Sequence, residues 1–151
     1  MKVEFYNSKK RKELIEKLNS QFGVKTLPTI IFETGREKIR GFSGDLTIDE
    51  IYALNKITNI EFIGLYLFSQ GLQDMRISFD GTTLLKSQFE HNVLSIDDDQ
   101  LDKWIRGNSL NMTVKSGMYI IKHNDDVFGC GISDGHNIIN FVPKERRIKK
   151  G

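Results

Sequence analysis

The feature that most constrains this chain is a set of three short apolar runs near its C-terminal end, separated by polar turns. Each run has the length of a strand and is rich in Ile, Val, Phe or Tyr: residues 117–122, 127–132 and 138–142. Such residues favour β-structure. The connections are built from His, Asn, Asp and Gly, which suit tight turns. The pattern predicts a hairpin followed by one more strand, which ends at Pro143 because proline cannot extend a central strand.

One clear helix is expected beside these strands, over residues 97–106. Leu101 and Trp104 can share one face of it. Its three leading aspartates, residues 97–99, suit the positive end of the helix dipole. Gly107 is expected to close the helix. Before it, a strand over 76–79 and a single helical turn within 82–88 are expected.

The first half of the chain has a different, mixed pattern. We expect, in order, a helix over 8–20, a hairpin over 29–42, a helix from Thr47 to about Asn55 and a buried strand over 61–68. Ser8 is the expected N-cap of the first helix, and Thr47 with Glu50 has the spacing of a capping box. The first helix also carries four consecutive cations, residues 9–12, in its first turn.

The pattern changes at Gly71, which suggests two domains. Residues 1–71 are expected to form a mixed α/β lobe and residues 72–151 a small strand-rich lobe with one helix, giving an α+β protein. No Pro/Gly/Ser-rich stretch separates the two, so we expect a substantial interface between them instead of a flexible linker.

Charge is distributed unevenly along the 151 residues. Residues 72–143 carry 6 Lys+Arg against 10 Asp+Glu, a net charge of −4, whereas residues 144–151 carry 5 against 1, a net charge of +4. A basic tail after an acidic body points to an anionic partner for the tail. The single cysteine, Cys130, excludes an internal disulfide, and the chain shows neither a secretory signal nor an apolar run long enough for a membrane span. These features favour a cytoplasmic location.

The residues that usually carry catalysis are sparse. His91, His123 and His136 lack metal-ligand spacing with one another or with Cys130, which lies mid-strand and is expected to be a buried structural thiol. Residues 97–99 lack the spacing of a calcium loop, and phosphate-binding glycine motifs are missing. The chain is therefore expected to be no enzyme and to need no cofactor or metal. An enzyme with a site built from His91, His136 or Cys130 is the less favoured alternative.

The second half resembles a PUA domain. The resemblance rests on Met75 to Leu85, His91 to Leu94, the acidic helix with Trp104, Ser116 to Ile121 and Val127 to Gly131. The final stretch Asn140 to Arg147 resembles the closing strand and basic end of PUA-like domains attached to RNA cytosine methyltransferases. The first half is similar to the pre-PUA domain of archaeal-type and ribosome-biogenesis proteins, chiefly over Gly35 to Gly44.

This resemblance implies a C-terminal pseudo-β-barrel that binds structured RNA, rRNA or tRNA, in ribosome biogenesis or RNA modification. Carried over by position, it assigns RNA contacts near the first helical turn and at the chain end: Lys86, Asn92, Lys144, Arg146, Arg147, Lys149 and Lys150. The alternative is a docking subunit of an RNA methyltransferase or ribosome-assembly complex, with an exposed apolar patch around Phe42 or Tyr52.

Overall fold

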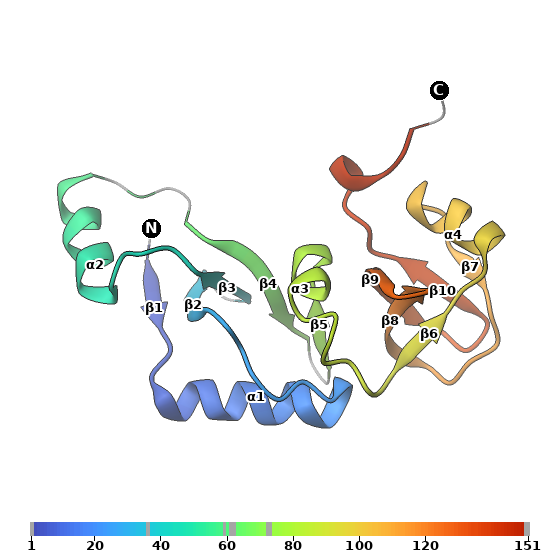
Figure 1. The fold of residues 1–151 in the computed structure, drawn as a ribbon, viewed down its shortest axis with the longest axis horizontal. Helices are drawn as coiled ribbons and strands as arrows, with labels where there is room; N and C mark the ends of the chain where they lie inside the picture. The colour runs from blue at the N-terminus through green and yellow to red at the C-terminus, as the bar shows by residue number, and fades with distance from the viewer. Residues whose placement is uncertain (1, 36, 59, 61–62, 72–73, 150–151) are drawn as a thin grey trace.

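The protein is described by a computed structural model that covers residues 2–35, 37–58, 60, 63–71 and 74–149. Two five-stranded sheets lie side by side, with a short helix between them and longer helices around them (Figure 1). The fold is α+β, as the sequence predicts. In the part of the chain that the structure describes, no helix has the length and hydropathy needed to cross a membrane.

The first sheet is antiparallel throughout and follows chain order. Its strands are β1 (Val3–Phe5), β2 (Ile30–Thr34), β3 (Lys38–Phe42), β4 (Leu65–Gln70) and β5 (Met75–Ile77). The predicted hairpin is thus β2–β3. The apolar run expected over 61–68 contributes β4 from Leu65, while residues 61–62 lie outside the described part. β4 has strands on both sides, β3 and β5.

Two helices accompany the first sheet. Helix α1 (Ser8–Phe22) buries Leu14, Leu18 and Phe22 against it. Its N-cap is Asn7, whose side chain accepts a hydrogen bond from Lys10 N; the expectation that Ser8 caps this helix was wrong because Ser8 is already helical. Helix α2 (Ile48–Ile57) begins with the predicted Thr47–Glu50 capping box, in which each side chain bonds to the other's backbone.

The second sheet has the order β6-β8-β9-β10-β7. Its strands are β6 (Val93–Ser95), β7 (Leu110–Asn111), β8 (Gly117–His123), β9 (Asp126–Ser133) and β10 (Asn137–Asn140). The predicted hairpin is β8–β9, and the strand after it is β10. β6 pairs with β8 in parallel, unlike the other neighbours.

Helix α4 (Asp98–Ile105) packs on the second sheet through Trp104. As expected, aspartates lead the helix, and Asp97 caps it by a capping box with Gln100. The Trp104 side chain is fully buried, and its Nε1 donates to the carbonyl of Phe128 at 2.7 Å. A side chain at residue 131 would collide with the indole, since a Cβ built on Gly131 would stand 2.7 Å from Cη2. The glycine in β9 is what allows the helix to lie this close.

The two sheets share one core. Buried side chains of α1 and the first sheet, such as Phe22 and Phe68, belong to the same apolar cluster as Ile120 and Cys130 of the second sheet. Ile121, the next residue of β8, faces the other way into a second cluster under α4. The substantial interface predicted from the sequence is therefore present. The short helix α3 (Phe79–Leu84) leads from β5 toward the second sheet.

The expected domain boundary at residues 71 and 72 falls between β4 and β5, which pair in the first sheet. The change from one sheet to the other lies between Ile77 and Val93. The sequence pattern changes near Gly71, but the first sheet continues past this residue, because β5 pairs with β4.

Candidate nucleic-acid interface

The basic C-terminal segment is folded onto the second sheet and α4. After Pro143 the chain forms a short 3₁₀ helix, η1 (Lys144–Arg146). The backbone N–H of Ile148 then donates to the carbonyl of Ile105 at 2.9 Å, and Arg147 Nε donates to the carbonyl of Val142 at 2.9 Å. These bonds tie the segment to the end of α4, so the positions of its cations are set by the fold.

Gly107 makes room for this contact. It follows α4 with a φ of +91°, in the left-handed region that side chains disfavour. A Cβ at this position would stand 2.5 Å from Nε of Arg147. The guanidinium of Arg147 therefore lies directly on the glycine backbone.

Between α4 and the C-terminal segment lies a hollow of about 450 Å³, which we call the basic cleft. It is lined by Arg106, Asn108, Lys144, Arg147, Ile148 and Lys149. Four of these residues are cations and none is a carboxylate. Arg106 is steadied by Asp102, one turn earlier in the helix, with Nε–Oδ1 at 3.1 Å. A cluster of cations with no carboxylate in its lining attracts phosphate groups.

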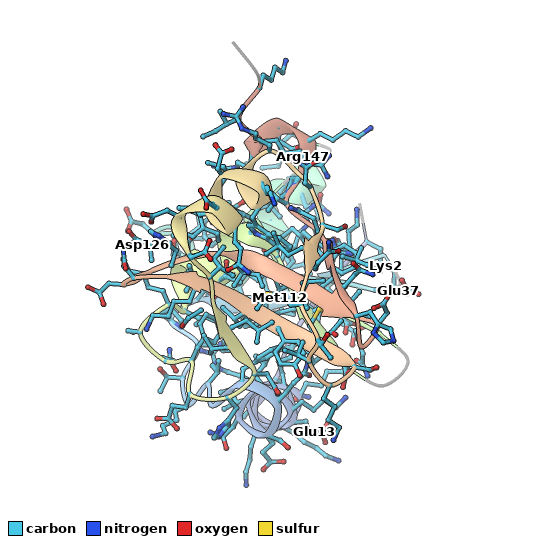
Figure 2. All side chains as sticks on the ribbon, turned by 90° about the vertical axis from the view of Figure 1, so that its right-hand side faces the viewer. Lys2, Glu13, Glu37, Met112, Asp126 and Arg147 are labelled. Atoms are coloured by element: carbon cyan, nitrogen blue, oxygen red, sulfur yellow. The ribbon has the colours of Figure 1, made fainter. Side chains whose placement is uncertain are left out.

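The acidic residues of the second sheet lie elsewhere. Asp97 and Asp98 begin α4, at the helix end opposite to Arg106, and Asp126 begins β9. Figure 2 shows Arg147 at one extremity of the molecule, Asp126 at its side and Glu13 of α1 at the opposite extremity. These aspartates are thus separated from the basic cleft, while Asp102 pairs with Arg106 and Glu145 lies in η1 next to it.

The structure brings only some of the predicted RNA contacts together. Lys144, Arg147 and Lys149 line the basic cleft. Arg146 points away from it and pairs with Asp80 of α3, with Nη2–Oδ1 at 2.8 Å. Lys150 lies outside the described residues.

The other two predicted contacts lie apart from the cleft. Lys86 pairs loosely with Asp126, with Nζ–Oδ1 at 3.5 Å. Asn92 has a φ of +53°, and its Nδ2 donates to the carbonyl of Gln21 at the end of α1, at 2.6 Å. Helix α1 runs along the side of the molecule opposite to the C-terminal segment (Figure 1). The RNA role of Lys86 and Asn92 stays a prediction. In the structure each side chain bonds to another part of the chain.

Two cleft residues were missed from the sequence, Arg106 and Asn108. Nothing in their immediate sequence distinguishes them from an ordinary helix end. They become part of the cleft only because Ile148 returns to Ile105 through a backbone hydrogen bond.

Two of the four cations at the start of α1, Lys10 and Arg11, have partners within the first lobe. Arg11 donates from Nη1 to the carbonyl of Thr29 at 2.6 Å and from Nη2 to that of Leu27. Lys10 pairs with Glu4. Arg11 thus ties the helix to the connection before β2, and these residues lie far from the basic cleft (Figure 1).

Of the candidate catalytic residues, His91 and His136 are exposed, whereas Cys130 is buried. The Cys130 thiol is 2% exposed and donates to the carbonyl of Ile77 in the other sheet at 2.9 Å. Burial raises the pKa of this thiol to about 11. The burial of Cys130 predicted from the sequence is confirmed. His123 Nε2 lies 2.6 Å from Oδ1 of Asp98, joining β8 to the start of α4.

The apolar patch expected around Phe42 or Tyr52 is centred on α2 and its surroundings. Phe42 is half-buried. Tyr52 is exposed, with one ring edge against Phe5 at 5.1 Å between centroids. The exposed large apolar side chains of this region are Leu46, Tyr52, Leu54, Ile57 and Leu65.

Comparison with known proteins bears on the second sheet. Residues 91–148 match the family model described as the methyltransferase RsmF PUA domain. The match begins just before β6 and ends at Ile148, so it includes the whole second sheet, α4 and most of the basic cleft. No curated protein sequence matches the chain. The chain therefore contains a PUA domain related to the PUA domains of RNA cytosine methyltransferases.

Proposed function

We propose that this protein is a non-catalytic RNA-binding protein that holds structured rRNA or tRNA on the basic cleft, in ribosome biogenesis or RNA modification. The observation that supports it best is the basic cleft itself, whose cations are positioned by the fold within a PUA domain. Charged contacts to phosphates provide most of the sequence-independent affinity for nucleic acid, through release of counterions.

The charge distribution favours approach of RNA toward the C-terminal end of α4. A polyanion is repelled by the aspartates that begin α4 and attracted by the cations beyond its C-terminal end. The buried, hydrogen-bonded Cys130 is not placed as a nucleophile, since its raised pKa disfavours the thiolate. The lobe formed by the first sheet, for which a pre-PUA relationship is our prediction, would then position the PUA domain instead of acting on substrate.

The test is RNA binding at several salt concentrations. Labelled total tRNA and rRNA fragments are titrated with the wild type and with a variant carrying Lys144→Gln and Lys149→Gln, both exposed in the cleft. Each lost phosphate contact is expected to flatten the slope of log affinity against log salt by about 1. The control variant carries Lys9→Gln and Lys12→Gln, which make the same charge change on exposed residues of α1.

The expected result is weaker binding and a flatter slope for the cleft variant only. Equal losses in both variants would mean that overall charge, and not the cleft, governs binding. Absence of binding to either RNA at low salt would overturn the proposal.

A second candidate function is docking on an enzyme, and the exposed apolar side chains around α2 favour it. Ile57 is 84% exposed and Leu65 is 52% exposed, and apolar side chains that form a contiguous exposed patch mark interaction sites. The matched domain is described as part of a methyltransferase, so the partner we propose is the catalytic domain of an RNA cytosine methyltransferase. Sedimentation of a mixture of the two proteins tests this. A complex that Ile57→Asp abolishes supports docking, and two separate species at micromolar concentration contradict it.

A further inference from the structure

A second hollow, of about 260 Å³, lies between the two sheets on the other side of η1. We call it the inter-sheet pocket. Its walls come from β3, β4 and β5, the start of α3 and the segment after β10. Three aromatic rings and three cations line it: Tyr66, Phe79, Phe141, Lys38, Arg40 and Arg76. Asp80 and Glu145 also line it.

Arg76 is the central feature of this pocket. Its guanidinium carbon lies 3.8 Å from the centre of the Phe141 ring, a stacked arrangement, and the Cys130 thiol lies beside it. The side chain is half-buried. Among the described residues no carboxylate forms an ion pair with Arg76. A partly desolvated guanidinium that forms no ion pair with a carboxylate can bind an anionic group strongly.

Aromatic surface adjoins this charge. The Tyr66 ring is half-buried, and Lys38 Nζ lies 5.9 Å from its centre. The pocket therefore combines ring faces with two cations that reach over them. Proteins that bind single-stranded nucleic acid use this combination, because bases stack on rings while cations hold the phosphates.

The size of the pocket limits its ligand. Pockets for drug-sized molecules enclose roughly 300–1,000 Å³, so a hollow of about 260 Å³ suits a ligand on the scale of one nucleobase. A base inside a duplex cannot enter, because its faces are covered by stacking. An unpaired nucleotide fits both the size and the chemistry.

The pocket and the basic cleft are neighbours. Lys144 and Arg147 line the cleft, whereas Pro143 and Glu145, from the same short segment, line the pocket. A strand that leaves the cleft over η1 therefore reaches the pocket within a short distance. The Glu145 carboxylate repels a phosphate next to it and can accept hydrogen bonds from donors on a base edge.

We infer that the inter-sheet pocket binds one unpaired nucleotide of the RNA, with its base stacked on Tyr66 and its phosphate paired with Arg76 and Lys38. This inference rests on the proposed function and adds to it a preference for RNA in which a single-stranded nucleotide adjoins a helix. The basic cleft holds the helical part, and the pocket reads the unpaired end.

The test compares one RNA hairpin with a blunt end and the same hairpin with a two-nucleotide 3′ overhang. The wild type is expected to bind the overhang form roughly tenfold more tightly, the range expected for stacking of one base. Tyr66→Leu and Arg76→Gln are each expected to remove this preference and to leave binding of the blunt hairpin unchanged. Tyr52→Leu, the same change on the exposed ring of α2, is the matched control and keeps the preference.

A second measurement is independent of the cleft and of variant folding. Mononucleotides are titrated into the ¹⁵N-labelled wild type, and shifts are expected at the amides of β4, β5 and the segment after β10. Equal affinity for both hairpins, together with no shifts at millimolar nucleotide, would overturn the inference while leaving the proposed function standing. Shifts without any hairpin binding would support the pocket and remove the proposed function.

Discussion

The guanidinium of Arg147 lies on the backbone of Gly107, so that a single added carbon at residue 107 would stand 2.5 Å from its Nε. This relationship fixes the C-terminal segment against the end of α4.

Gly107→Ala is expected to weaken RNA binding. The new methyl group displaces Arg147, and the φ of +91° strains any side chain, at a cost of about 1–2 kcal/mol. Gly135→Ala is a matched control, since Gly135 has a φ of +101° but its nearest neighbour would be Ser116 Oγ at 3.8 Å. Both variants should lose similar stability in urea titrations, and only the first should lose RNA affinity. Equal affinity of the two would show that the position of Arg147 does not matter.

Asp80→Asn is expected to strengthen RNA binding. It removes the carboxylate that holds Arg146 at 2.8 Å and leaves this half-exposed cation free for phosphate. The salt slope should steepen by about 1. Asp45→Asn, which removes an exposed carboxylate between β3 and α2, controls for net charge. If the two variants bind alike, Arg146 has no part in binding.

Asn92→Ala is expected to act on stability. It removes the hydrogen bond to Gln21 and places alanine at a φ of +53°, together worth about 1–3 kcal/mol. Asn92→Gly relieves the backbone strain and should recover part of this loss. Urea unfolding, followed by fluorescence of the single Trp104, measures both. A loss of RNA affinity at unchanged stability would instead favour the RNA contact predicted for Asn92 from the resemblance.

Stability should fall at alkaline pH through Cys130. The ordinary pKa of the thiol is 9.0 and burial raises it to about 11, so the folded state retains the proton longer than the unfolded state. The stabilisation is complete below about pH 9 and is lost as the pH rises to about 11, by ~2–3 kcal/mol. The difference in unfolding free energy between the wild type and Cys130→Ala should shrink over this range. If this free-energy difference stays constant from pH 9 to pH 11, the raised pKa of Cys130 is contradicted.

Much of the fold was predictable because it depends on local chemistry. The capping boxes at Thr47 and Asp97 and the turn residues around Asn124 and Gly135 mark their elements directly in the sequence. β5 was harder to place, because three residues carry too little pattern to show which sheet they join. Its place is decided by pairing with β4.

The candidate site was predictable only in part, because only some of its residues are marked by local sequence. The cations of the C-terminal segment are visible as a run, but Arg106 becomes their neighbour through the contact between Ile148 and Ile105. The stacking of Arg76 on Phe141 joins β5 of the first sheet to the segment after β10. Contacts between distant segments depend on tertiary packing, which local pattern does not encode.

The bond from the Cys130 thiol to the carbonyl of Ile77 has a consequence for how this protein can be divided. The PUA match begins at residue 91, yet Ile77 belongs to the first sheet and its carbonyl is satisfied by the second. A fragment that starts at residue 72 would carry β5 without β4, exposing an unpaired strand edge that invites aggregation. A cut at residue 72 or at residue 91 would also divide the apolar core that the two sheets share, so the chain is expected to fold as one unit.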